Sequence, residues 1–465
     1  MEDTNNVQYN KIENLINDAA KTDESFGDNI VTSIYKKAEE LANEVVTVDA
    51  NKRSKWEKRL DDVLTSRLFG YPIMLLLLGL IFWITIEGAN VPSAMLANLF
   101  FGFEEKITDF FMYINAPSWL HGLLVLGVYR TLAWVISVML PPMAIFFPLF
   151  TLFEDLGYLP RVAFNLDNAF RKAGTHGKQA LTMSMGFGCN AAGVIACRII
   201  DSPRERLIAT ITNNFVPCNG RFPTLIAISM IFIGLGASSK IGSLLASLSV
   251  VGMILIGIIV TLLVSKFLST TFLKGVPSSF TLELPPYRKP QIGRILIRSL
   301  IDRTLFVLGR AIMVAAPAGA ITWIVANVTI GGVSILNHVA GFLDPFAMLL
   351  GLDGFILMAF ILGLPANEIV LPILIMSYMS QGAMLELDSL EALRNLLLEN
   401  GWTWVTGLNF MLFSLLHFPC GTTLLTIKKE TNSNKWPLFT FLLTTIIAIL
   451  VTFIINMIAT LIGIV

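Results

Sequence analysis

Charged residues are scarce in this chain, and their scarcity decides its broad class before any motif is considered. Only 14% of the 465 residues are charged, the formal net charge is zero, and 54% are hydrophobic, with a mean hydropathy of +0.70. Such a composition is typical of an integral membrane protein. The balanced charge gives no electrostatic basis for nucleic-acid binding, so we expect no nucleic-acid partner.

Cysteine and several familiar motifs are also scarce. The four cysteines all lie in apolar segments, whereas a secreted disulfide framework would place them in polar loops, so we expect reduced thiols. The polar N-terminus has no basic region followed by an apolar core, as a cleavable signal peptide would. Residues 174–179 only resemble a P-loop, and neither HExxH nor CxxC occurs. We therefore predict that this polypeptide does not hydrolyse nucleotides and is not an enzyme.

Long apolar runs dominate instead, and a membrane-crossing helix needs about 20 apolar residues. The runs are 68–86, 131–153, 179–197, 222–239, 241–265, 311–343, 401–427 and 436–465. Prolines and glycines interrupt several of them, which points to the broken helices of a transporter. We expect an all-α polytopic membrane protein with roughly eight to ten membrane segments, some re-entrant. Segments 91–116 and 386–400 carry charges, so we expect them to lie on the membrane or to cap a cavity.

The chain divides into three regions by composition. Residues 1–67 are polar with apolar positions at helical spacing, and they end in a basic run from Lys52 to Arg67. By the positive-inside rule this predicts a helical N-terminal region in the cytoplasm. A proline-rich connector at 283–299 separates a first membrane half, 68–300, from a second half, 301–465, which ends in a final transmembrane helix.

The two halves share a weak internal repeat. The motif Gly-Phe-Gly-Cys-Asn at 186–190 resembles Gly-Leu-Pro-Ala-Asn at 363–367, and Phe-Val-Pro-Cys-Asn-Gly at 215–220 resembles His-Phe-Pro-Cys-Gly at 417–421. Each motif is a break of small residues or proline within an apolar run. A duplication predicts two similar units of broken helices.

Three cysteines lie in these breaks, at positions 189, 218 and 420. A proline removes one backbone N–H and frees carbonyl groups, which in a membrane must bind a partner or line a cavity. Thiols beside free carbonyls suit a transition-metal ion that sheds its water, so Cys189, Cys218 and Cys420 predict a metal path, together with the adjoining Asn190. Cys197, between Ala196 and Arg198, is expected to pack as a small apolar side chain.

Two further polar residues accompany the second pair of breaks. Glu368 is the single charged residue between 354 and 385, and a carboxylate at membrane depth is a functional candidate. It is either a metal ligand, a proton carrier or the partner of an arginine such as Arg310, and Asn367 beside it offers an amide ligand. His417, three residues before Cys420, is either a ligand, a proton relay or a packing residue.

Several motifs in order resemble the membrane part of the bacterial ferrous iron transporter B family, FeoB. They are 153–164, 176–178, 186–190, 283–290 and 418–420 followed by 427–431. The resemblance implies two gate-type repeats around a metal path lined by Cys189, Cys218 and Cys420. It implies transport of Fe(II) as substrate across the bacterial cytoplasmic membrane, with no permanently bound cofactor.

The sequence departs from the family pattern in two ways. The family's N-terminal GTP-binding domain does not occur in these 465 residues, so either a separate GTPase or small accessory protein acts in trans or this branch runs without one. A homo-oligomer is a further possible assembly. The residues after Cys189 and Cys218 also differ from the usual ones, so Mn(II) or another divalent metal is a second candidate substrate. Three further readings stay open: a transporter of an organic solute such as a nucleoside, a membrane enzyme using Cys420 and His417, and a scaffold without transport.

Overall fold

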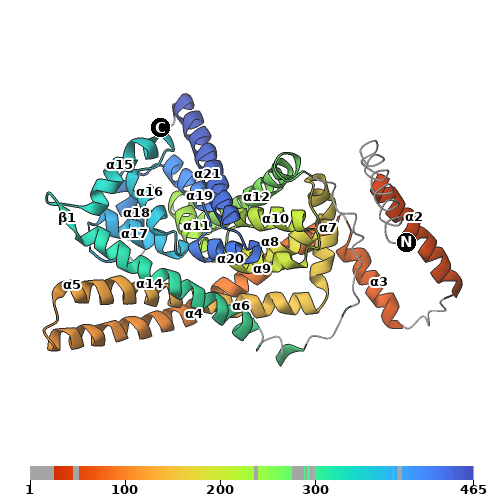
Figure 1. The fold of residues 1–465 in the computed structure, drawn as a ribbon, viewed down its shortest axis with the longest axis horizontal. Helices are drawn as coiled ribbons and strands as arrows, with labels where there is room; N and C mark the ends of the chain where they lie inside the picture. The colour runs from red at the N-terminus through yellow and green to blue at the C-terminus, as the bar shows by residue number, and fades with distance from the viewer. Residues whose placement is uncertain are drawn as a thin grey trace, which may run out of the picture.

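The computed structural model is almost entirely helical (Figure 1). It describes residues 26–45, 52–66, 68–234, 239–274, 287, 291–293, 297, 299–380, 382–384 and 390–463. Within these residues the only strands are β1, Thr329–Ile330, and β2, Val333–Ser334, which pair antiparallel. Helices predominate because hydrocarbon offers backbone groups no partner, so each segment must satisfy its own hydrogen bonds.

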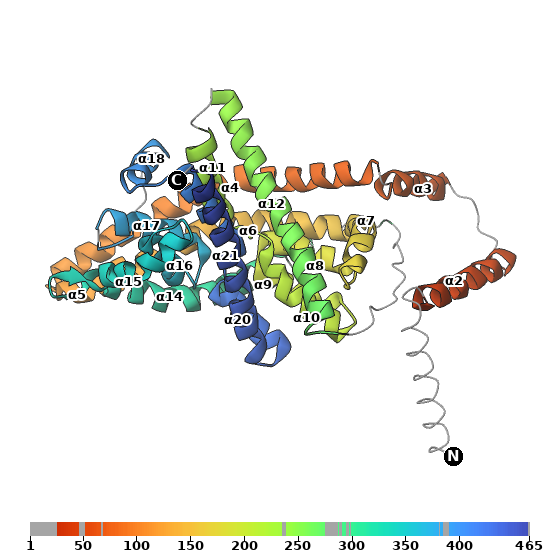
Figure 2. The same cartoon turned by 90° about the horizontal axis from the view of Figure 1, so that it is seen from above.

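The N-terminal region forms two polar helices at one end of the molecule, away from the apolar bundle (Figures 1 and 2). They are α2, Phe26–Val45, and α3, Lys52–Leu64. The helical spacing expected near Ile12 lies outside the described residues. Asp61 of α3 fastens this region to the bundle, since its carboxylate accepts hydrogen bonds from Arg161 Nε at 2.9 Å and from the Tyr287 hydroxyl at 2.7 Å.

Next come two long antiparallel helical segments along one side of the bundle (Figure 1). The first is α4, Gly70–Tyr113, and the second comprises α5, Ser118–His121, η1, Gly122–Tyr129, and α6, Arg130–Asp155. Residues 91–113, which belong to the segment expected to lie on the membrane or to cap a cavity, continue the first apolar helix without a break. Within the hairpin Glu104 forms an ion pair with Arg130, whose Nε lies 2.9 Å from Oε1.

The remaining helices form two units of similar design. The first unit contains α7, Tyr158–Lys172, α8, Lys178–Gly188, α9, Asn190–Ala196, η2, Cys197–Ile199, α10, Pro203–Thr212, η3, Asn213–Phe215, α11, Phe222–Ser229, η4, Met230–Gly234, and α12, Ser239–Thr270. The second contains η5, Ser299–Leu305, α14, Phe306–Asn327, α15, Ile335–Leu349, α16, Gly354–Leu362, η6, Asn367–Ile369, α17, Val370–Tyr378, α18, Leu390–Glu399, α19, Trp404–Leu416, α20, Gly421–Thr431, and α21, Lys435–Ile462.

Among the described residues, six helical segments are long and apolar enough to cross a membrane, or seven if the pair α15 and α16, bent by 111°, counts as one more. The expected eight to ten segments included 179–197 and 222–239, which form short broken helices instead. The apolar run at 311–343 is divided between two helices. Helix α14 ends at Asn327 because Gly331 and Gly332, with φ of +62° and +85°, turn the chain back in a hairpin.

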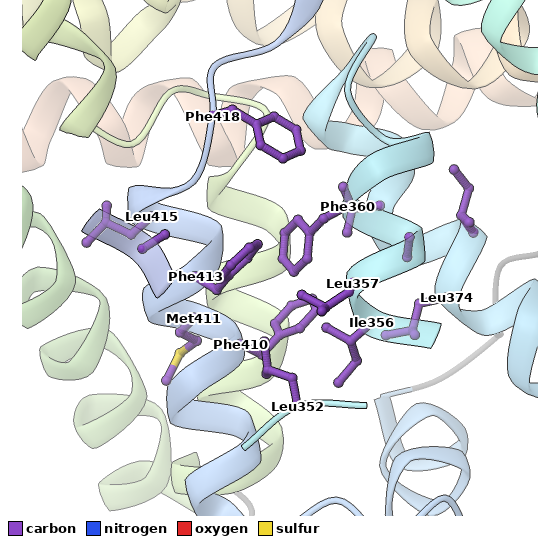
Figure 3. Packing of buried hydrophobic residues seen from close by; sticks show 14 of the residues in the cluster. Leu352, Ile356, Leu357, Phe360, Leu374, Phe410, Met411, Phe413, Leu415 and Phe418 are labelled. Atoms are coloured by element: carbon purple, nitrogen blue, oxygen red, sulfur yellow. The ribbon is translucent and has the colours of Figure 1, made fainter. Parts of the chain in front are cut away.

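Aromatic packing holds the second unit together (Figure 3). Phe360 of α16 lies between Phe410 and Phe413 of α19, with ring centroids 5.2 and 4.9 Å away. Phe418, just beyond α19, extends the same cluster. These buried rings fix the ends of α16 and α19, which are the points where both helices break.

The contact of Asp61 with Arg161 and Tyr287 yields the first prediction. Burial alone would raise the pKa of Asp61, but the bonds from Arg161 and Tyr287 lower it below its ordinary value of 3.8. The docking of α3 is therefore strongest above that pH and weakens as the pH falls through the lowered pKa. Asp61→Asn should speed hydrogen exchange in α3 by about fivefold at neutral pH, for a loss of roughly 1 kcal/mol.

Mass-spectrometric hydrogen exchange of the purified protein measures this effect. The exposed neighbour Asp62 provides a matched control, because Asp62→Asn removes the same charge from the same helix. Equal exchange in the two variants would contradict the anchoring role of Asp61.

Candidate metal path

Four helix breaks meet in the middle of the two units. We name them break A, residues 186–190, break B, 216–221, break C, 363–367, and break D, 417–421. At the matching positions of A and C the backbone is almost identical, with φ and ψ of −157° and 125° at Cys189 and −151° and 122° at Ala366. The chain is therefore extended in the same way at these two matching positions.

Backbone hydrogen bonds join the breaks within each unit. The Asn219 amide donates to the Gly188 carbonyl at 3.3 Å, linking B to A, and the Gly421 amide donates to the Leu364 carbonyl at 2.7 Å, linking D to C. Asn190 strengthens the first link, since its side-chain amide donates to the Val216 carbonyl at 3.2 Å when it is turned to satisfy its hydrogen bonds. Each pair of breaks thereby becomes one rigid corner.

Arg221 ties the two units together. Its side chain is only 1% exposed, and its guanidinium donates to four carbonyl groups. One is Asn214 in the first unit at 3.1 Å, and the others are Leu415, His417 and Phe418 in the second, at 2.7, 3.3 and 3.2 Å. The carbonyl groups at the ends of η3 and α19 have no partner within their own helices, and they share the Arg221 guanidinium as hydrogen-bond donor. Buried backbone carbonyls need such a donor.

A narrow cavity of about 30 Å³ lies where the four breaks converge. This is room for about two water molecules. Six of the seven predicted site residues line it, and they come from all four breaks. They are Cys189, Asn190, Cys218, Asn367, Glu368 and Cys420. The structure therefore brings together side chains separated by up to 231 positions in the sequence.

The donors in the cavity are close but not gathered at one point. Asn367 Nδ2 lies 3.8 Å from Cys218 Sγ, and Cys420 Sγ lies 3.2 Å from Thr423 Oγ1. The oxygen of the Asn367 amide is buried without a hydrogen-bond partner. Over the described residues, no three His, Cys, Asp or Glu side chains are arranged to hold one metal ion together.

Glu368 enters the cavity from break C and lies against Gly220 of break B. In the part of the chain that the structure describes it forms no ion pair, and the nearest influential positive charge is that of Arg221. Pairing with Arg310 was one of the three alternatives for Glu368; the bond that Arg310 makes in the structure is to Thr426 Oγ1, at 2.8 Å.

His417 and Cys197 do not reach the cavity. The His417 ring is 1% exposed, and its Nδ1 lies 2.9 Å from the Ser414 carbonyl. Its ring centroid is 4.8 Å from those of Phe360 and Phe418, so it belongs to the aromatic cluster of the second unit. Cys197 is buried as expected, with its thiol 3.3 Å from the Gly193 carbonyl.

Three residues at or near the cavity were not predicted from the sequence. Met139 and Met143 line the cavity from α6 and add thioether sulfurs, which are soft ligands. The sequence signal near them was the proline pair at 141–142, which lies between the two methionines inside α6. Arg221 was the third, and its signal was a lone arginine within an otherwise uncharged break.

Together, the fold and the cavity define a class: a polytopic all-α membrane protein built from two repeats of broken helices around a shared polar centre. Comparisons with known proteins agree. The family model described as nucleoside recognition, or Gate, matches residues 136–232 and 308–434, one segment in each unit. The model of the ferrous iron transport protein B C terminus matches residues 250–302. No solved structure matches.

Full-length relatives place the chain more narrowly. The Fe(2+) transporter FeoB of Staphylococcus aureus strain MSSA476 is 28% identical over 425 residues, which cover 90% of this chain and 61% of that protein. Those of Methanocaldococcus jannaschii and Campylobacter jejuni are both 27% identical, covering 97% and 89% of this chain and 66% and 67% of their own length. The chain is similar to these transporters over most of its own length, and it spans about three fifths of the length of the Staphylococcus relatives.

The role of Arg221 gives the second prediction. Arg221→Lys keeps the charge, but an ammonium group cannot reach carbonyls on both units at once as the planar guanidinium does. The carbonyls left without a donor should cost about 3 kcal/mol and lower the thermal unfolding midpoint in detergent. Arg206→Lys, at an exposed position of α10, should leave the midpoint nearly unchanged. Equal midpoints for the two variants would refute the proposed link between the units.

Proposed function

We propose that this protein transports a divalent metal ion, Fe(II) first of all, across the cell membrane through the cavity between breaks A, B, C and D. The observation that carries the proposal is the convergence of three thiols, two amides and one carboxylate on a single small cavity deep in an apolar bundle. Polar groups at that depth are costly and mark ion or substrate pathways. The relatives named Fe(2+) transporter FeoB support iron as the substrate.

The donor set suits an ion in transit. A dehydrating ion can exchange water for the sulfurs of Cys189, Cys218 and Cys420 and for the oxygens of Asn367 and Glu368 in succession. Ligands spread along a path bind each position weakly enough for release, which a closed site of converging thiolates would prevent. We therefore regard the metal as cargo, with no resident cofactor, and His417 as a residue that positions break D.

The size of the cavity favours a metal ion over an organic solute. Pockets that enclose drug-sized organic molecules measure roughly 300–1,000 Å³. The space at the four breaks is about 30 Å³, which matches an ion with a remaining water or two and not a nucleoside. Mn(II) has ligand preferences that also fit Glu368 and Asn367, so it is the second candidate substrate.

Orientation and partners complete the proposal. The basic residues of α3, which include Arg59, favour a cytoplasmic location of the N-terminal helices by the positive-inside rule. The docking of α3 on Arg161 and Tyr287 then gives a cytoplasmic partner, such as a GTPase or small accessory protein acting in trans, a mechanical connection to the first unit. Assembly into a homo-oligomer is compatible with the same arrangement.

Metal uptake into proteoliposomes that contain only this protein, under reducing conditions, tests the proposal. Fe(II), Mn(II) and Zn(II) are compared, with Cys189→Ser/Cys218→Ser as the inactivating variant. We expect Fe(II) flux that falls at least tenfold in this variant, because two of the soft donors are lost. Cys197→Ser is the matched control, since that thiol lies outside the cavity, and its flux should stay near the wild-type value.

Two results would count against the proposal. Wild-type Fe(II) flux in the Cys189→Ser/Cys218→Ser variant would rule out the cysteine-lined path. Absence of flux for every metal, even after a candidate GTPase and GTP are added, would rule out the transport function itself.

A further inference from the structure

Gly220 of break B lies directly against the carboxylate of Glu368. It is buried between Cys218 and Arg221, and a Cβ added to it would overlap Oε1 and Cδ of Glu368 and lie 3.1 Å from Cγ. The three atoms nearest to such a Cβ all belong to Glu368. A side chain at 220 and the present position of the Glu368 carboxylate therefore exclude each other.

Glu368 cannot easily retreat by moving its backbone. It lies in η6, two residues after the extended Ala366, and the next two residues, Ile369 of η6 and Val370 at the start of α17, are buried in the core of the second unit. The Gly421 amide further fixes break C through the Leu364 carbonyl at 2.7 Å. A Cβ at 220 would instead be accommodated by a different side-chain rotamer, which moves the carboxylate.

The surroundings of the carboxylate show what its position is suited to. Beside it lie the Asn367 amide oxygen, buried and without a partner, and the thiol of Cys218, 3.8 Å from the Asn367 nitrogen. This side of the cavity therefore offers one sulfur ligand and two oxygen ligands, of which one is a carboxylate and the other a neutral amide. Thiolates favour Zn(II) and Cu(I), whereas carboxylate and amide oxygens favour Mn(II) and similar harder ions.

We propose that Gly220 is a specificity-determining residue: by lacking a Cβ it keeps the Glu368 carboxylate in the ion path, so that the cavity selects Fe(II) and Mn(II) over the softer Zn(II). The inference rests on the proposed transport function and adds the physical basis of selectivity. Without the carboxylate in place, the cysteines dominate and the path takes Zn(II) in preference, as the usual order of affinities dictates.

A double-mutant cycle on Gly220 and Glu368 tests the inference. The measured quantity is the Fe(II)-to-Zn(II) flux ratio in proteoliposomes loaded from an equimolar mixture under reducing conditions. We expect Gly220→Ala and Glu368→Gln each to lower this ratio by about tenfold. The double variant should fall no further than Glu368→Gln alone, because both changes act through one carboxylate.

The control is Gly252→Ala on α12, where an added Cβ meets no atom within 4 Å. It should leave the ratio unchanged. If Gly220→Ala does not yield a folded protein, Glu368→Gln alone decides: an unchanged ratio overturns the proposal, and a lowered one supports it.

The outcomes separate this inference from the function on which it rests. A wild-type protein without flux overturns transport itself. A second outcome is wild-type flux that depends on Cys189 and Cys218 together with an Fe(II)-to-Zn(II) flux ratio that Gly220→Ala does not change. This outcome overturns only the selectivity role of Gly220. Additive effects in the double variant show that the alanine acts elsewhere and overturn it too.

Discussion

The contact on which the rest of this structure depends is the buried guanidinium of Arg221. It binds carbonyl groups from η3 of the first unit and from the end of α19 in the second. A planar group with five donors can serve several acceptors in fixed directions, which a lysine cannot. The helices of the two units can therefore end side by side, because one cation binds carbonyl groups that are left open at η3 and at the end of α19.

Helix breaks inside a membrane are otherwise costly, and the chain offsets that cost locally wherever it can. Side-chain amides do part of the work, as when Asn213 Nδ2 donates to the Asn190 carbonyl at 3.2 Å. Backbone amides do another part, through the links between breaks A and B and between C and D. What remains free faces the small cavity, and irregular backbone is tolerated at such a place because it lines a path.

Much of this was visible in the sequence, for physical reasons. Scarce charge identified a membrane protein, and helix-breaking residues within apolar runs located all four breaks, because proline and glycine act locally. The repeat and the six predicted residues that line the cavity followed from those breaks. The length of helix α4 could not be predicted in this way. Its charged residue Glu104 is stabilised by Arg130, 26 residues further along the chain, and only tertiary structure brings the two together.

The finer details of the site were equally out of reach from sequence. His417 has the spacing of a ligand beside Cys420, yet it packs among phenylalanine rings because α19 ends at Leu416 and turns its side chain toward α16. The contact between Gly220 and Glu368 joins residues 148 positions apart. Such pairings depend on how two units dock, and no local pattern encodes them.

The most direct test of the account is metal protection of the cysteines against alkylation, resolved residue by residue with mass spectrometry. Cys218 and Cys420 are partly accessible, whereas Cys197 is buried outside the cavity and serves as the internal reference. The account predicts that Fe(II) slows labelling of Cys218 and Cys420 and leaves the rate at Cys197 unchanged. Identical labelling with and without Fe(II), at concentrations that support uptake, would contradict a metal path through the four breaks.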